Sequence, residues 1–226
     1  MMRKIMPSPI GGCVEAISSK SAAHRLMICA ALAKEPAKVS YRTTNKDMEA
    51  TAHCLAAMKE GKTLFPCGES GSTLRFLLPV AAALGLDGRF YMEGRLPERP
   101  LAPLDEQMIL HGATVRKEER YLYVGGKLIP GEYTLPGDVS SQYISGLLFA
   151  LPLLDGPSTL TVTGKVESAP YIAMTSSSAA SSDSGVGFND SMWSEYPSRR
   201  CPEKYIPAAS LSRVSSSRVE NSGISG

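Results

Sequence analysis

The chain has 226 residues, of which 43% are hydrophobic and 20% are charged, so it has the composition of an ordinary globular protein of one large domain or two small ones. A formal net charge of +2 gives no reason to expect a nucleic-acid or membrane-surface partner. A signal peptide, a membrane span and a zinc site are not expected either, because the apolar runs are too short and the five cysteines and three histidines show no metal-ligand spacing.

The first predicted helix, residues 22–33, follows the hydroxyl-rich stretch Ser18-Ser19-Lys20-Ser21. Ser21 and Arg25 are four residues apart and therefore share a helix face. Lys20 and Arg25 oppose the helix dipole near this end, and an anionic ligand explains their positions better than helix stability does. Two solvated surface charges are the alternative.

An amphipathic outer helix is predicted over residues 47–59, after a strand at 38–41. Asn45 is expected to cap this helix and Gly61 to end it. A short strand at 62–65 then leads into the next motif.

Residues 66–75 predict a strand end, a tight glycine turn and the start of an apolar helix that runs to about residue 85. Hydroxyl side chains at Ser70, Ser72 and Thr73 can cap this helix or donate to a ligand. The free N–H groups of the first turn suit an anion, and Arg75 adds a cation one turn in. A capped core helix is the other interpretation.

A stiff loop with three prolines, residues 94–104, follows a strand at 89–92. It either presents the guanidinium groups of Arg95 and Arg99 to an anion or is a rigid turn with incidental arginines. The pattern then predicts a helix at 104–110 and strands at 114–116, 121–124 and 133–135.

A third apolar helix, residues 143–154, again follows a hydroxyl cluster, Val139-Ser140-Ser141-Gln142, and precedes a strand at 159–163. Helices that are apolar on all sides are buried. Three such helices with polar N-termini indicate ends that converge on one anionic site. The order β-α-β-α-β-β occurs more than once, which indicates a repeated α/β unit.

The composition changes after Thr175, because 16 of the last 51 residues are serine, against 12 of the first 175. Such a bias is typical of a segment that does not pack. We therefore expect an ordered domain over residues 1–175 and a disordered or poorly packed tail over residues 176–226.

Five motifs in this order resemble the 3-phosphoshikimate 1-carboxyvinyltransferase (EPSP synthase) family, over roughly residues 5–175. They are Ser19-Lys20-Ser21 with Arg25, Gly68 to Arg75, Arg99-Pro100-Leu101, Ser140-Ser141-Gln142 and Glu167-Ser168-Ala169-Pro170-Tyr171. The resemblance implies the N-terminal domain of the enolpyruvyl transferase fold, incomplete here, with repeated βαβαββ units and buried parallel helices. It also implies a cytoplasmic enzyme of aromatic amino-acid biosynthesis, monomeric at full length, with no cofactor or metal.

The implied reaction moves the enolpyruvyl group of phosphoenolpyruvate onto the 5-hydroxyl of shikimate 3-phosphate. By motif, the residues implied to bind shikimate 3-phosphate are Lys20, Ser21, Arg25, Ser140, Ser141, Gln142, Ser168 and Tyr171. Those implied to bind phosphoenolpyruvate, where the inhibitor glyphosate competes, are Lys20, Gly71, Arg99 and Gln142. Lys20 is the implied catalytic residue, through proton transfer.

The sequence also departs from the family pattern. The family is roughly twice as long, and no residues here match the catalytic acids of its second domain. It usually has Lys where Ala169 stands, Asp where Ala173 stands, and a leucine-rich helix where the serines follow Thr175. Because leucine codons read one base out of frame often give serine, a frameshift is our hypothesis for the tail, and resequencing of the coding DNA tests it.

Three alternatives remain at this stage. The chain could be a non-catalytic fragment that binds shikimate 3-phosphate, or a chain that exposes apolar helix faces and does not fold stably. A related UDP-N-acetylglucosamine enolpyruvyl transferase is the third, although that family typically has Lys-Asn where Lys20-Ser21 stands and lacks the Ser-Ser-Gln motif.

Overall fold

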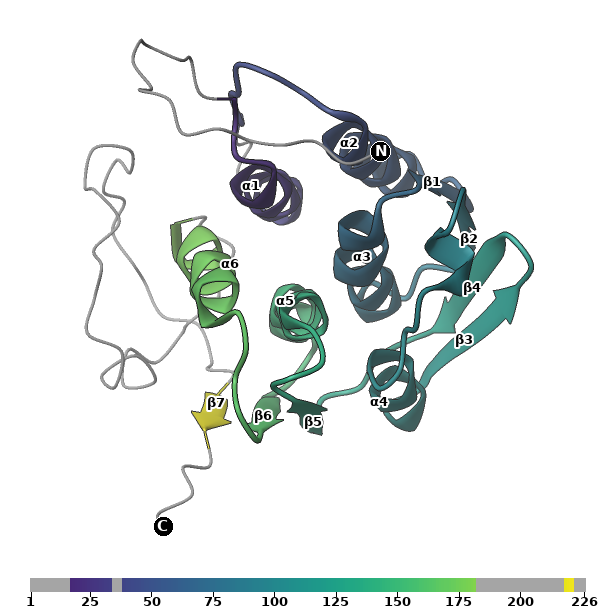
Figure 1. Ribbon diagram of the computed structural model, residues 1–226. Helices are drawn as coiled ribbons and strands as arrows, with labels where there is room; N and C mark the ends of the chain where they lie inside the picture. Colours follow the sequence, from purple (N-terminus) through teal and green to yellow (C-terminus); the bar gives the residue numbers. More distant parts are fainter. Residues whose placement is uncertain (1–16, 34–37, 182–217, 222–226) are drawn as a thin grey trace, which may run out of the picture.

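The computed structural model describes residues 17–33, 38–181 and 218–221, and it is an α/β structure (Figure 1). The helices are α1 (Lys20–Leu32), α2 (Lys46–Lys59), α3 (Gly71–Ala83), α4 (Leu104–Leu110), α5 (Ser141–Ala150) and α6 (Ala169–Ser181), with short 3-10 turns η1 (Leu96–Glu98) and η2 (Leu151–Leu153). The strands are β1 (Leu64–Gly68), β2 (Gly88–Met92), β3 (Ala113–Glu118), β4 (Tyr121–Gly126), β5 (Glu132–Pro136), β6 (Thr159–Thr163) and β7 (Arg218–Asn221).

The elements from β1 to β4 form one complete βαβαββ unit, as the sequence predicts. Its sheet has the order β1-β2-β4-β3, with β1 and β2 parallel and the other neighbours antiparallel. Helix α3 makes the crossover that two parallel strands require. Alternate strand residues such as Phe65 and Phe90 are fully buried, and their tilted rings pack together with 5.0 Å between ring centroids.

The second sheet has the order β5-β6-β7, and both of its pairs are parallel. Helix α5 connects β5 to β6, and α6 follows β6, so the same alternation begins again. In Figure 1 the β1–β4 sheet lies at the right and the β5–β7 sheet at the lower left, and α1, α3, α5 and α6 are seen nearly end-on, with α1 farthest from both sheets.

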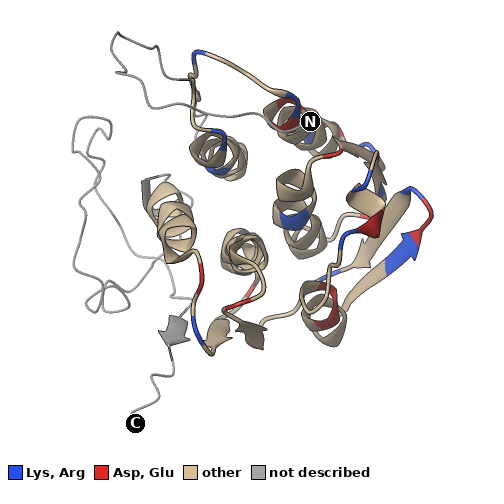
Figure 2. Cartoon of the chain, in the orientation of Figure 1, with Lys and Arg blue, Asp and Glu red and all other residues tan. Residues whose placement is uncertain are grey.

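Helices α3 and α5 form the centre of the core, and the residues of α5 from Tyr143 to Ala150 are all buried. Neither α5 nor α6 carries a charged side chain (Figure 2), as expected for helices enclosed by other elements. Gly146 brings α5 close to α3, because a Cβ atom there would lie 2.3 Å from the carbonyl oxygen of Arg75. The prediction of buried, roughly parallel helices is confirmed.

Two predicted elements differ from the structure. Residues 38–41 form no strand. The third apolar helix ends at Ala150 and is followed by the 3-10 turn η2. Pro152 explains the second difference, because its ring and missing N–H disfavour continuation of an α-helix.

The predicted tail boundary at 175/176 falls inside α6, which continues to Ser181. Ser176 and Ser178 are buried there, and the Ser176 hydroxyl donates to the carbonyl oxygen of Ile172 at 3.3 Å, which satisfies it within the helix. Residues 218–221 form β7, which pairs in parallel with β6 at the edge of the second sheet. The rest of the predicted tail, 182–217 and 222–226, lies outside the described residues.

Candidate ligand-binding site

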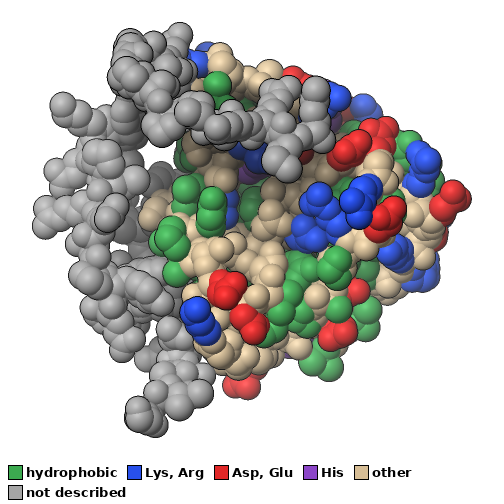
Figure 3. Space-filling model, viewed as in Figure 1, with side chains coloured by type: hydrophobic (Ala, Val, Ile, Leu, Met, Phe, Trp, Pro, Cys, Tyr) green, Lys and Arg blue, Asp and Glu red, His purple; other side chains and the backbone are tan. Residues whose placement is uncertain are grey.

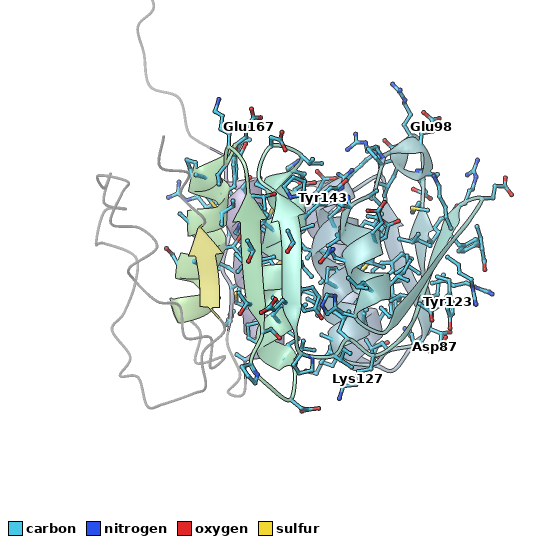
Figure 4. All side chains as sticks on the ribbon, turned by 90° about the horizontal axis from the view of Figure 1, so that it is seen from below. Asp87, Glu98, Tyr123, Lys127, Tyr143 and Glu167 are labelled. Atoms are coloured by element: carbon cyan, nitrogen blue, oxygen red, sulfur yellow. The ribbon has the colours of Figure 1, made fainter. Side chains whose placement is uncertain are left out.

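A cavity of about 260 Å³ lies where the N-terminal ends of four helices meet. It is lined by Lys20, Ser21, His24, Arg25, Ser72, Phe76, Ser141, Gln142, Ser168 and Tyr171. Figure 4 shows that Tyr143 and Glu167, at the starts of α5 and α6, lie at the same end of the molecule as Glu98, whereas Asp87 and Lys127 lie at the opposite end. The predicted convergence of polar helix ends is therefore confirmed.

Each hydroxyl cluster divides its side chains between the helix and the cavity. Ser19, Ser70 and Ser140 are N-caps, and their oxygens accept from backbone N–H groups of the first turns of α1, α3 and α5. Their near neighbours Ser21, Ser72 and Ser141 line the cavity. The capping and ligand-binding interpretations of these motifs are thus compatible, because one serine of each cluster caps the helix and another lines the cavity.

Arg25 is 2% exposed and forms part of the cavity wall. Its guanidinium donates to Thr175 Oγ1 at 2.7 Å, to the Ser21 carbonyl at 2.8 Å and to Ser145 Oγ at 3.3 Å. Among the described residues no carboxylate forms an ion pair with it, and burial lowers the pKa of Arg25 to about 10. A buried cation held only by neutral groups is an arrangement that favours an anionic ligand.

Lys20 lies at the mouth of the cavity, and its Nζ is 2.6 Å from Asp47 Oδ2 at the start of α2. Burial by itself raises the pKa of Asp47, but the hydrogen bond and positive charge of Lys20 outweigh this and lower it overall. The pair holds the lysine ammonium in place while 47% of the Lys20 side chain stays exposed.

A second group of cations adjoins the cavity around Gly71. A Cβ atom on Gly71 would lie 2.8 Å from Arg75 Nη1 and 3.1 Å from Arg99 Nη1, so glycine leaves room for both guanidinium groups. Arg75 also donates to Gln142 Oε1 at 2.9 Å, and Gln142 in turn donates to Ser72 Oγ at 2.9 Å. Figure 3 shows basic side chains gathered on this face, beside a hollow.

The loop of residues 94–104 is fixed to both central helices. Arg75 Nη2 and the Tyr143 hydroxyl donate to the same carbonyl oxygen, that of Pro100, at 3.2 and 2.8 Å. Arg99 is therefore presented on a tethered support, as the three prolines predict.

Ser168, just before α6, has φ = 58°, and it is the one described non-glycine residue in the left-handed region. Strained backbone of this kind clusters at binding sites. The Ser168 carbonyl accepts from the Tyr171 N–H at 2.9 Å, which places both residues in the first turn that faces the cavity.

Seven of the residues predicted for the site line the cavity together: Lys20, Ser21, Arg25, Ser141, Gln142, Ser168 and Tyr171. Ser140 instead caps α5, and Gly71 and Arg99 lie in the adjoining cation group. His24 and Phe76 were not predicted as site residues, although each lies four residues after another lining residue, Lys20 or Ser72, and shares its helix face. Asp47, Ser145 and Thr175 were not predicted either, because they act through long-range contacts.

The described part of the chain contains no group of three or more His, Cys, Asp or Glu side chains that could hold a metal ion. Within the same residues, no helix combines the length and apolar character needed to cross a bilayer.

Comparison with known proteins gives one family. The family model of EPSP synthase (3-phosphoshikimate 1-carboxyvinyltransferase) matches residues 5–65 and 59–178. The 3-phosphoshikimate 1-carboxyvinyltransferase of Clostridium kluyveri is 38% identical over 194 residues, which cover 76% of this chain and 45% of the relative. The protein of the same name from Clostridium botulinum strain Eklund 17B is 36% identical over 221 residues, with coverages of 85% and 50%.

Among solved structures, EPSP synthase from Acinetobacter baumannii superposes with a TM-score of 0.60 at 22% identity, over 72% of this chain and 42% of that one. This likeness shows that the fold is part of the enolpyruvyl transferase fold. The chain spans about half the length of the curated relatives it matches.

Proposed function

Since the chain belongs to the EPSP synthase (3-phosphoshikimate 1-carboxyvinyltransferase) family, an enzyme family of the shikimate pathway, we propose that its cavity binds shikimate 3-phosphate. The bound molecule would accept the enolpyruvyl group of phosphoenolpyruvate on its 5-hydroxyl, with release of phosphate. The relatives above are named for this reaction, so the UDP-N-acetylglucosamine alternative is not favoured.

The observation that carries this proposal is the buried Arg25 in a cavity rimmed by serine hydroxyls. Shikimate 3-phosphate has two anionic groups on a hydroxylated ring, and it needs cations, helix N-termini and neutral hydrogen-bonding groups together. The cavity offers all three, from α1, α3, α5 and the start of α6.

We assign the residues by their places around the cavity and by the family motifs. The proposed ligands of shikimate 3-phosphate are Lys20, Ser21, Arg25, Ser140, Ser141, Gln142, Ser168 and Tyr171. The proposed ligands of phosphoenolpyruvate are Lys20, Gly71, Arg99 and Gln142. Gln142 connects the two groups, because Arg75 beside Gly71 donates to its side-chain oxygen.

Lys20 is the proposed catalytic residue. Its ammonium would give a proton to the methylene carbon of phosphoenolpyruvate as the 5-hydroxyl attacks the neighbouring carbon and releases its own proton to solvent. When phosphate then leaves the adduct, the methyl group would return a proton to Lys20. Asp47 holds the ammonium in position at the cavity mouth, through the ion pair of 2.6 Å.

A non-catalytic fragment that binds shikimate 3-phosphate is the second candidate, and the coverage of about half of each relative favours it for residues 1–226 taken alone. Closure of a second domain over a ligand excludes water and completes a site. Binding and turnover therefore have to be measured separately.

The test is a calorimetric titration of the purified chain with shikimate 3-phosphate. We expect saturable binding that weakens about tenfold in Ser141→Ala, from the loss of a hydrogen bond to a charged group. Thr114→Ala is the control, because Thr114 is exposed on β3 and lines no part of the cavity. Absence of saturable binding to the folded chain contradicts the proposal.

A further inference from the structure

His24 lines the cavity and is 1% exposed, yet its Nε2 atom has no hydrogen-bond partner. Its other ring nitrogen, Nδ1, is 2.6 Å from Thr51 Oγ1 on α2. A buried polar atom without a partner is costly, so it indicates a position at which a ligand supplies the missing bond. What that ligand must offer depends on whether Nε2 carries a proton.

A chain of hydroxyls connects His24 to a backbone carbonyl and decides this question. Thr51 Oγ1 is 2.7 Å from Thr73 Oγ1. The Thr73 hydroxyl directs its proton toward Ser70 Oγ at 2.7 Å and toward the backbone carbonyl oxygen of Asp47 at 3.3 Å.

The direction of each bond follows from the Asp47 carbonyl, because a carbonyl oxygen only accepts and a hydroxyl has one proton. The Thr73 proton is directed toward this carbonyl and Ser70 Oγ. Thr51 must therefore donate to Thr73. Thr51 can therefore only accept from His24, which places the histidine proton on Nδ1 and leaves a lone pair on Nε2.

Electrostatics keeps the ring neutral. The pKa of His24 is lowered to about 4, mainly by burial; the charge of Asp47 opposes this shift, and the charges of Lys20 and Arg25 contribute to it. The ring also packs edge-on against Phe76, with 6.3 Å between ring centroids. At neutral pH, Nε2 is therefore an uncharged acceptor on a residue that lines the cavity beside the cations Lys20 and Arg25.

We propose that His24 is a specificity-determining residue whose Nε2 accepts a hydrogen bond from a hydroxyl of the bound ligand. An acceptor repels phosphate and carboxylate oxygens, so His24 marks the part of the cavity that faces a ring hydroxyl rather than an anionic group. The inference deepens the proposed function and rests on it for the identity of the hydroxyl donor, a ring hydroxyl of shikimate 3-phosphate. The acceptor state of Nε2 rests on the hydroxyl chain alone.

The first arm of the test needs no ligand. Nitrogen-15 NMR of the histidine-labelled chain at pH 7 distinguishes the protonated from the unprotonated ring nitrogen, with the assignment made by His24→Phe. We expect a single tautomer with the proton on Nδ1, and in Thr51→Val a mixture, because the acceptor that fixes the proton is removed. A proton on Nε2 in the unchanged chain overturns the proposal.

The second arm adds shikimate 3-phosphate and, separately, sulfate, which has anionic oxygens but no hydroxyl. The Nε2 resonance should move with shikimate 3-phosphate and not with sulfate. His24→Phe should weaken the binding of shikimate 3-phosphate about fivefold to tenfold, which corresponds to the loss of one hydrogen bond. The same variant should leave sulfate binding unchanged. Equal losses for both ligands would indicate a merely structural role and overturn the proposal. His53→Phe, exposed on α2, is the matched control.

The two hypotheses fail differently. Shikimate 3-phosphate that binds without moving Nε2 overturns the role of His24 and leaves the proposed function intact. A folded chain that does not bind it at all overturns the proposed function and the identity of the donor, and the first arm then decides the acceptor state by itself.

Discussion

Arg25 is buried in the cavity wall, and its hydrogen bonds go to two hydroxyls and a backbone carbonyl. Its guanidinium also lies over the rings of Phe76 and Tyr171, at 5.0 and 5.8 Å from their centroids. These neutral contacts fix the orientation of the guanidinium group but do not neutralise its positive charge. A bound anion would neutralise this charge.

Replacement of this cation should therefore separate stability from binding. We expect Arg25→Met to change the free energy of unfolding by less than about 1 kcal/mol, because an apolar side chain of similar length avoids the desolvation cost. Ser145 and Thr175 stay paired with one another at 2.8 Å, so neither hydroxyl is orphaned. The same variant should lose nearly all the thermal stabilisation that shikimate 3-phosphate gives the unchanged chain. Urea unfolding and ligand-dependent melting measure the two effects, and a large loss of stability without ligand would contradict the argument.

His24 should make the stability of the chain depend on pH. Its pKa falls from 6.5 in the unfolded chain to about 4 in the folded one, so the unfolded state binds more protons between these values. Stability should be highest above pH 6.5 and decrease by about 3 kcal/mol as the pH falls to 4. Urea unfolding at pH 7, 5.5 and 4.5 measures this slope. His24→Phe should flatten it, and a slope unchanged in that variant would show that other groups cause it.

At the scale of elements, replacement of two glycines by alanine should destabilise the fold by different amounts, because their surroundings differ. In Gly146→Ala the new methyl meets the backbone carbonyl of Arg75, so α3 and α5 must separate, at a cost of about 1–3 kcal/mol. In Gly71→Ala its close contacts are the ends of two arginine side chains, which can turn away, and Leu96 Cδ1 lies at an ordinary 3.7 Å. We expect thermal unfolding to show a much larger loss of stability for Gly146→Ala than for Gly71→Ala. Equal losses would mean that the guanidinium groups are as rigid as the backbone.

Helix positions were the most predictable elements, because their signals are local. Asn45 caps α2, and the three hydroxyl clusters each supply the N-cap that the sequence indicates. The strand predicted at 38–41 fails because β propensity has no effect without a partner strand. The serines of α6 were misjudged for a similar reason: composition does not reveal that small residues fit between α1 and α5.

Much of the site was also predictable, since its members sit beside helix N-termini and match family motifs. Contacts between distant segments were not. Thr175 reaches Arg25 across 150 positions, and Ser145 across 120, and nothing local marks either residue. The hydroxyl chain behind His24 likewise joins three elements, α1, α2 and α3, which only the folded structure brings together.

For the whole molecule, the N-terminal ends of α1, α3, α5 and α6 line the cavity, and the chain spans about half of each curated relative. Both substrates of the proposed reaction are anions, and the cations described above lie in the cavity lining and beside Gly71. Substrate binding and chemical turnover thus have different requirements. Binding requires the residues that line this cavity, whereas turnover also requires that water be excluded.

We therefore expect residues 1–226 alone to bind shikimate 3-phosphate and to release almost no phosphate when phosphoenolpyruvate is added. A polypeptide carrying the remaining half of a relative, supplied in trans or by fusion, should restore phosphate release, because a second wall would close over both anions. The restored activity should be lost in Lys20→Ala and kept in Thr114→Ala, which is remote from the cavity. Robust phosphate release by residues 1–226 alone, lost in Lys20→Ala, would show that one wall is sufficient and that closure is not what the chemistry requires.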